Sequence, residues 1–297
     1  SVGGRLSVTR TGITLAWALA WIMAAWSVDS ARAQIAPQPA CLNAAAPRTA
    51  IFFVNGVTTT LDEARLNAGK LELEFLNRLP TMSPAVQANC HVFSLNYNPT
   101  AGEVNDFLEA TQQQLGITPT SFWLELEGLG LFTPPLIRDA LQGPMTDLNR
   151  IDTATIERHA ATYREQIASP SCRRVLVVPH SQGNLYTNAA YDLVFGQPPS
   201  PPVGALRIVG VATPAQTIQG NGLYRTSTTD VLINAIRLIR PATLLSNTNW
   251  GVSPLLLSRS YSGGHSFIGY LSADPSRAQI LSDIESSLTA LAAVNPC

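Results

Sequence analysis

Charged side chains are scarce in this chain of 297 residues and make up only 13% of it. Basic and acidic groups nearly cancel, which gives a formal net charge of −1 at pH 7. The sequence also lacks the stripe or cluster of Lys and Arg that neutralises a phosphate backbone, so we expect no nucleic-acid partner. Internal repeats are absent, and the chain beyond its first 33 residues suits a single domain, 34–297, with a large core.

Metal-binding patterns are missing as well. The four cysteines form no Cys-x-x-Cys pair, and none stands beside a histidine at the spacing of a zinc site. We therefore predict no metal site. An even number of cysteines instead indicates two disulfides, which form in an oxidising compartment.

A long uncharged run occurs at the N-terminus, over 11–26, after Arg5 and Arg10. It is followed by the small-x-small sequence Ala31-Arg32-Ala33. This order is typical of a secretory signal peptide, so we predict a signal at 1–33 that is cleaved after Ala33. The alternative is a membrane anchor, but a spanning helix needs about 20 apolar residues. We therefore expect a secreted or periplasmic protein with no stable membrane span after cleavage.

Apolar runs with strand character alternate with helical patterns along the rest of the chain. Such alternation implies right-handed crossovers, and hence a mostly parallel central sheet with helices on both faces, the α/β class. The predicted strands are 50–54, 91–97, 175–178 and 206–212, and the predicted helices are 61–79, 103–114, 151–167, 184–191 and 275–293.

The four cysteines allow three disulfide pairings. Cys41, Cys90 and Cys172 each precede a predicted strand, and Cys297 follows the last helix. In a parallel sheet all four would gather at the edge opposite the carboxyl ends of the strands. We favour the pairs Cys41–Cys90 and Cys172–Cys297, with a role in stability.

The sequence from Val175 to Asn184 carries the strongest functional signal. Aliphatic residues end abruptly in Pro179-His180-Ser181-Gln182-Gly183, and a helical pattern then begins. A strand, a sharp turn and a helix in this order hold a serine hydroxyl in a strained, exposed position. Gly183 stands where a side chain would collide with the neighbouring strand, whereas Pro179 replaces the first glycine of Gly-x-Ser-x-Gly. The alternative is that Ser181 only caps the helix.

A nucleophilic serine needs a histidine base and a carboxylate that orients it. The one histidine after Ser181 is His265, in a glycine loop that opens an apolar segment. Between them lie no Glu and two Asp, Asp192 and Asp230. Asp192 falls about three turns along the following helix and should point away. Asp230 follows the extended run 223–229, at the expected carboxyl end of a strand, so we predict the catalytic set Ser181, Asp230 and His265.

The order and setting of these residues resemble the α/β-hydrolase superfamily, particularly its lipase and esterase branch, from Ile51 to the C-terminus. The resemblance implies a secreted serine hydrolase that cleaves carboxylic esters through an acyl-enzyme, without a cofactor. The substrate would be a small-molecule or lipid ester. Asn55-Gly56 lies where such enzymes place half of the oxyanion hole, so the backbone N–H groups of Val57 and Gln182 would be the two donors.

Two other functions use the same features. An acyltransferase would pass the acyl group to an alcohol with the same three residues, and a catalytically silent binding protein would keep only the fold. In the segment at about 116–150, apolar and aromatic residues are broken by Gly and Pro. We slightly favour a helical hairpin packed on the core here, and the alternative is a lid-like insertion over the serine. A second apolar stretch, 244–257, could line the pocket.

The other three histidines are not expected to catalyse. His91 begins a strand, which places it at the wrong edge of the sheet. His159 lies on a predicted helix and is expected to be solvated. His180, beside the serine, is interpreted as a packing residue.

Overall fold

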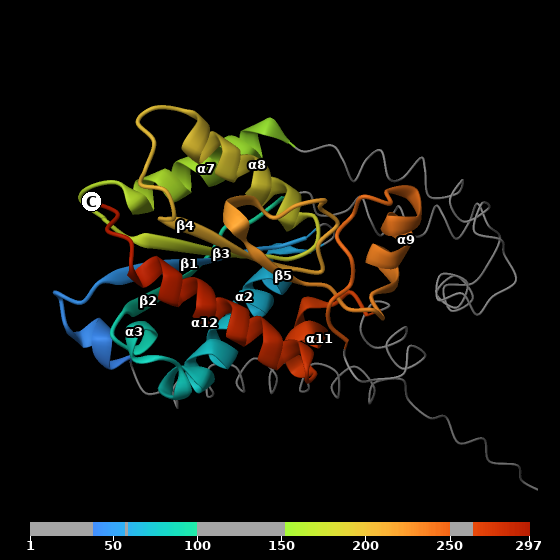
Figure 1. Ribbon diagram of the computed structural model, residues 1–297, viewed down its shortest axis with the longest axis horizontal. Helices are drawn as coiled ribbons and strands as arrows, with labels where there is room; N and C mark the ends of the chain where they lie inside the picture. The colour runs from blue at the N-terminus through green and yellow to red at the C-terminus, as the bar shows by residue number, and fades with distance from the viewer. Residues whose placement is uncertain (1–37, 57–58, 100–151, 250–263) are drawn as a thin grey trace, which may run out of the picture. The chain divides into compact units, whose positions relative to one another are not determined.

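The structure is a computed structural model of the chain, and it describes residues 38–56, 59–99, 152–249 and 264–297 (Figure 1). These residues belong to one compact unit, Gln38–Cys297. Among the helices described, none combines the length and the apolar character needed to cross a membrane. The predicted signal peptide 1–33, the helix 103–114, the insertion at 116–150 and part of the apolar stretch 244–257 lie outside the described residues.

The described strands form one five-stranded sheet in the order β2-β1-β3-β4-β5, and every neighbouring pair is parallel. This confirms the α/β class predicted from the alternating pattern. The strands are β1 (Arg48–Val54), β2 (Cys90–Leu95), β3 (Arg174–Pro179), β4 (Leu206–Val211) and β5 (Leu223–Arg225).

Helices pack on both faces of the sheet. The helices α7 and α8 lie on one face, while α2, α11 and α12 lie on the other (Figure 1). The α-helices are α2 (Leu61–Arg78), α3 (Pro84–Gln87), α7 (Thr153–Ile167), α8 (Gly183–Gly196), α9 (Val231–Ile239), α11 (Phe267–Ser272) and α12 (Ser276–Ala292). Short 3₁₀ turns lie at η1 (Pro39–Leu42), η2 (Leu79–Thr81) and η3 (Gln219–Asn221).

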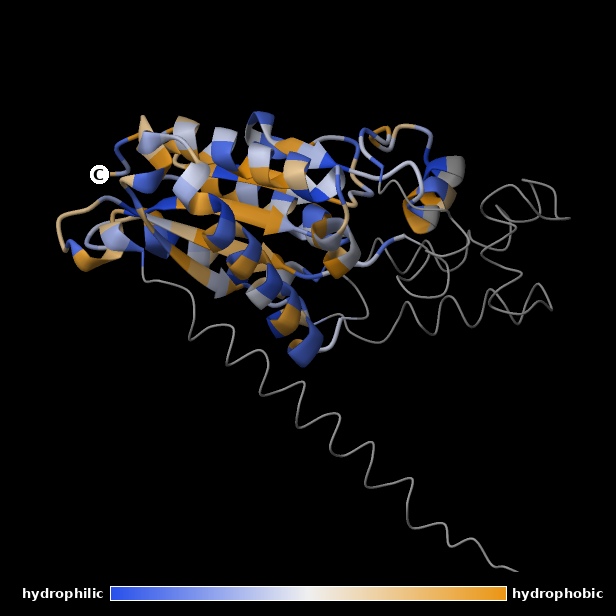
Figure 2. Ribbon diagram, turned by 90° about the horizontal axis from the view of Figure 1, so that it is seen from below, coloured by the Kyte–Doolittle hydropathy of each residue, from blue (hydrophilic) through white to orange (hydrophobic). Residues whose placement is uncertain are grey.

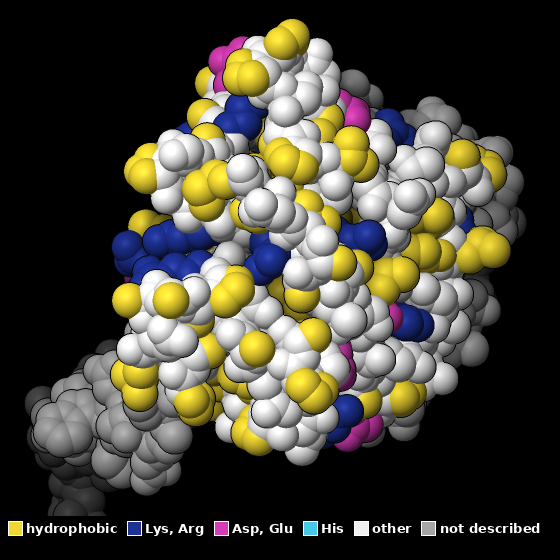
Figure 3. Space-filling view, turned by 60° about the vertical axis from the view of Figure 1, so that its left-hand side comes forward, with side chains coloured by type: hydrophobic (Ala, Val, Ile, Leu, Met, Phe, Trp, Pro, Cys, Tyr) yellow, Lys and Arg dark blue, Asp and Glu magenta, His cyan; other side chains and the backbone are white. Residues whose placement is uncertain are grey.

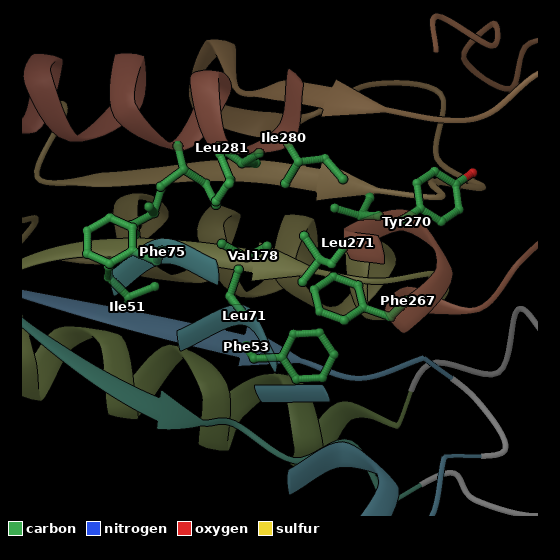
Figure 4. Close-up of a cluster of buried hydrophobic side chains, with 14 of the residues drawn as sticks. Ile51, Phe53, Leu71, Phe75, Val178, Phe267, Tyr270, Leu271, Ile280 and Leu281 are labelled. Atoms are coloured by element: carbon green, nitrogen blue, oxygen red, sulfur yellow. The ribbon is translucent and has the colours of Figure 1, made fainter. Parts of the chain in front are cut away.

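Two apolar cores result from the alternation of side chains along the strands. In β1, Ile51 and Phe53 face α2 and α12, whereas Phe52 faces α7 and its ring packs 5.4 Å from that of Tyr163. Figure 2 shows hydrophobic strands enclosed by helices whose outer surfaces are polar. Figure 4 shows the first core, in which the ring of Phe53 from β1 packs against the ring of Phe267 from α11. Because both faces of β1 and β3 are buried, these central strands read as nearly continuous apolar runs.

Both favoured disulfides, Cys41–Cys90 and Cys172–Cys297, are present. Cys90 begins β2, and Cys172 directly precedes β3, so these bonds lie at the amino ends of the strands as predicted. At the same edge, the Arg174 guanidinium donates to the carbonyl of Ala292, the last residue of α12, and to that of Val294, which follows the helix. Figure 3 views the molecule from this side and shows a band of Lys and Arg side chains. The disulfides and the Arg174 bonds therefore join distant segments of the chain at this edge. The band of cations is a gathering in space that the sequence alone did not indicate.

Candidate active site

Ser181 lies at a sharp turn between the end of β3 and the start of α8. Its φ of +55° is left-handed, which is uncommon and strained for a residue with a side chain. Neighbouring strand ends hold the turn, because His180 N–H donates to Val54 O at 2.9 Å and Ser181 N–H donates to Val211 O at 3.0 Å. The strand, turn and helix predicted from the sequence are therefore present.

Gly183 allows α8 to start directly against β1. A Cβ at this position would lie 2.7 Å from Val54 O and 2.8 Å from Asn55 O, both backbone atoms. The predicted collision with the neighbouring strand is confirmed. The chain accepts Pro179 in place of the first glycine of the pattern, and Pro179 remains in register with Val54 in the sheet.

Asn184 holds the turn from inside the protein. Its buried Nδ2 donates to Ser181 O at 2.8 Å and to Val211 O at 3.1 Å. These bonds join the turn to the end of β4. This role was not predicted from the sequence, because an asparagine on a helix carries no signal of a contact with a distant strand.

Ser181, His265 and Asp230 are in direct contact, although they are far apart in the sequence. Ser181 Oγ lies 2.8 Å from His265 Nε2. On the other side of the imidazole, Nδ1 lies 3.0 Å from Asp230 Oδ2 and 3.1 Å from Oδ1. A carboxylate only accepts, so Nδ1 carries the proton and Nε2 accepts from the serine hydroxyl. Such an arrangement can take the serine proton while Oγ attacks an electrophilic carbon.

The serine hydroxyl is less exposed than the sequence led us to expect. Ser181 is only 3% exposed. The side chain of His265 contacts it on one side, and Gly56 approaches so closely that a Cβ there would lie 2.6 Å from Ser181 Cβ. Packing against the neighbouring loops thus covers a residue that the turn by itself would present to solvent.

Asp230 does not lie at the end of a strand, so that expectation was wrong. β5 ends at Arg225, and Asp230 is the N-cap of α9, where its Oδ1 accepts from Ile233 N–H at 3.0 Å. Helix capping explains the difference, because an aspartate before an apolar helical run accepts a hydrogen bond from a first-turn backbone N–H that has no partner within the helix. Asp230 is fully buried. Asp192 is exposed on α8 and takes no part in the site, as expected.

Gly264 lets the histidine loop rest on the aspartate loop. Its φ is +79°, and a Cβ there would collide with Thr229 O. The glycine loop predicted before His265 therefore has a steric purpose: it brings two backbones into contact so that Nδ1 reaches the carboxylate.

Tyr270 is a part of the site that was not predicted from the sequence. Its hydroxyl donates to Asp230 Oδ2 at 2.8 Å and accepts from Ser227 N–H at 2.7 Å. The ring lies in the apolar core with its oxygen at the outer end (Figure 4). In the sequence, Tyr270 is one apolar residue among several on a short helix, so only the folded structure reveals the contact.

His180 packs behind the imidazole of His265. The two rings are 4.9 Å apart, and His180 Nε2 donates to His265 O at 2.8 Å. Burial, reinforced by the neighbouring His265, lowers the pKa of His180 well below 6.5. His180 is therefore neutral near pH 7 and supports the histidine loop, in agreement with the predicted packing role.

Of the two expected oxyanion donors, Gln182 is within the described residues and Val57 is not. Gln182 is buried, directly follows Ser181, and precedes the first residue of α8. Val57 lies outside the described residues. The turn before it is held by Asn55, whose side chain accepts from Asn98 N–H at 2.8 Å and donates to Asn98 O at 2.9 Å.

The remaining histidines are structural. His91 and His159 are buried, and burial lowers the pKa of each from 6.5 to about 4. The expectation that His159 is solvated was wrong, because its ring on α7 lies against those of Tyr163 and Tyr186. In the part of the chain that the structure describes, no group of His, Cys, Asp and Glu side chains could hold a metal ion.

Comparisons of the chain with protein-family models, with curated proteins and with solved structures found no match.

Proposed function

We propose that the protein is a serine hydrolase of the α/β-hydrolase superfamily that cleaves carboxylic esters, as lipases and esterases do. The observation that carries the proposal is the continuous contact from Ser181 Oγ through His265 to Asp230. It is supported by the left-handed turn at Ser181, which lies at the carboxyl end of a parallel strand. Ligands of open α/β sheets bind beyond this edge.

The mechanism is acyl transfer to water. Ser181 Oγ attacks the ester carbonyl while His265 Nε2 takes its proton, and the imidazolium then protonates the leaving alcohol. Asp230 holds the neutral imidazole in the tautomer with the proton on Nδ1 and stabilises the imidazolium that forms. Water attacks the resulting acyl-enzyme with His265 again as the base, which releases the acid and restores Ser181.

Developing negative charge on the ester oxygen would be stabilised by two backbone N–H groups, those of Gln182 and Val57. Gln182 is supported by its position immediately after the serine, at the amino end of α8. Backbone N–H groups and the helix dipole stabilise an anion at this end of a helix. For Val57 the support is that it follows Gly56, which lies against Ser181.

The substrate would be a small-molecule or lipid ester, and the protein would act outside the cytoplasm. The two disulfides support export, because such bonds persist in oxidising compartments. The three side chains perform acyl transfer without a cofactor.

Hydrolysis of p-nitrophenyl esters of increasing chain length tests the proposal. Ser181→Ala should abolish turnover, whereas Ser200→Ala, at an exposed serine that bonds only to nearby carbonyls, should not change it. The chain-length profile would measure the size of the acyl pocket. No turnover, together with no labelling of Ser181 by a fluorophosphonate, would refute the proposal and favour a silent binding protein.

Product analysis with and without an added alcohol separates the hydrolase from an acyltransferase. A hydrolase releases the free acid in both cases. A new ester as the main product in the presence of alcohol would assign the same three residues to acyl transfer.

A further inference from the structure

The Tyr270 hydroxyl lies between a fixed donor and a fixed acceptor. Ser227 N–H donates to it at 2.7 Å, and it donates to Asp230 Oδ2 at 2.8 Å. Tyr270 is fully buried, and its ring packs in the core that contains Phe267 and Leu271 (Figure 4). The hydroxyl proton is therefore directed at the carboxylate.

Three groups hold the Asp230 carboxylate from different sides. His265 Nδ1 and the Tyr270 hydroxyl both meet Oδ2, and Ile233 N–H binds Oδ1. Without the tyrosine hydroxyl, Oδ2 would keep only the imidazole as a partner among these groups. A buried carboxylate that loses a donor becomes less stable as an anion.

We propose that Tyr270 is a positioning residue, which holds the Asp230 carboxylate toward His265 Nδ1 and stabilises its negative charge. This inference rests on the proposed function and names a further residue of the same site. Tyr270 follows His265 by five residues, so one segment of chain supplies both the imidazole and the group that orients its carboxylate.

The chemistry of the phenol supports this role. Burial, together with the charge of Asp230, raises the pKa of Tyr270 well above 10. The hydroxyl therefore keeps its proton and acts as a donor to the carboxylate throughout the working pH range.

Tyr270→Phe removes only the hydroxyl, and Tyr163→Phe is the matched control. Tyr163 is also fully buried, but its hydroxyl lies near Asn96 and Thr187, away from the three residues of the site. Loss of one hydrogen bond to a charged group should lower kcat about 10- to 100-fold. KM should stay nearly constant because Tyr270 does not touch the substrate, and Tyr163→Phe should leave both constants unchanged. Equal kcat in wild type and Tyr270→Phe would overturn the inference.

A spectroscopic readout separates this inference from the proposed function. The proton on His265 Nδ1, shared with Asp230, should give a downfield ¹H resonance that His265→Ala removes. Tyr270→Phe should shift this resonance and Tyr163→Phe should not. An unchanged resonance in folded Tyr270→Phe overturns the inference. If Tyr270→Phe shifts the resonance but the wild-type protein hydrolyses no ester, only the hydrolase proposal is refuted.

If Tyr270→Phe does not fold, 3-fluorotyrosine at position 270 provides the second test. It keeps the hydroxyl and makes it more acidic, so the contact with Asp230 strengthens while the fold is retained. The Nδ1 proton resonance should then move from its wild-type position. A resonance that stays in place would show that the hydroxyl does not act on the His265–Asp230 pair.

Discussion

Replacing Gly183 with alanine tests whether close approach of α8 to β1 forms the candidate site. The new Cβ would lie 2.7 Å from Val54 O and 2.8 Å from Asn55 O, whereas ordinary van der Waals contacts begin at 3.4 Å. Neither oxygen belongs to a flexible side chain. Val54 O also accepts from His180 N–H at 2.9 Å, so moving it weakens a bond that supports the turn.

The free energy of unfolding should therefore fall by about 1–3 kcal/mol, the usual cost of overpacking. The rate of ester hydrolysis should fall by more than the loss of folded protein alone would cause. The turn carries Ser181, and a displacement of about 1 Å at a reacting group can lower the rate about 100-fold.

Gly69→Ala is the matched control for this substitution. Gly69 lies inside α2, and a Cβ there would meet nothing within 4 Å. It should raise the free energy of unfolding by about 1 kcal/mol because alanine is the better helix former. Urea unfolding followed by circular dichroism measures stability, and p-nitrophenyl ester hydrolysis or fluorophosphonate labelling measures the site. A Gly183→Ala variant as stable and reactive as wild type would refute the steric reasoning.

Three further predictions concern stability. The pKa of buried His91 is lowered from 6.5 to about 4, so below about pH 6.5 protons bind the unfolded chain more than the folded one, and this histidine should remove roughly 2 kcal/mol of stability between about pH 7 and about pH 5; in urea titrations His91→Gln should therefore lose roughly 2 kcal/mol less than wild type over this range, while the similar share of His159 remains. Asp283→Asn should cost roughly 3 kcal/mol in thermal unfolding, because it leaves Arg225 without the carboxylate that both its Nε and Nη2 contact at 2.6 and 2.7 Å. Replacing Cys172 and Cys297 by serine opens a loop that spans 125 residues and should lower stability by up to about 5 kcal/mol; an unchanged Tm would contradict the entropic argument.

Local patterns in the sequence were sufficient for the α/β class and for most helices and strands. The helix predicted at 61–79 is α2, because Thr60 and Glu63 form a capping box at its start. The run 175–178 became β3, since β-branched and aliphatic residues suit a strand that is buried on both faces. Periodicity and capping act over a few residues, so they can be read directly from the chain.

Elimination within the sequence also selected Ser181, Asp230 and His265 as one set, and the three side chains are in contact in the folded chain. Elimination selected residues that meet because the chain after Ser181 contains one histidine, and only two aspartates lie between Ser181 and His265. The prediction failed on where Asp230 lies, since a strand end and a helix cap have similar local sequences.

Only the tertiary structure decided which other side chains serve this site. Asn184, His180 and Tyr270 act through partners that are distant in the sequence, as in the bonds from Asn184 to Val211 and from Tyr270 to Asp230. It also decided that Ser181 and His159 are buried. The physical reason is that such contacts depend on how strands and helices pack, and packing is a property of the whole fold, not of any single segment.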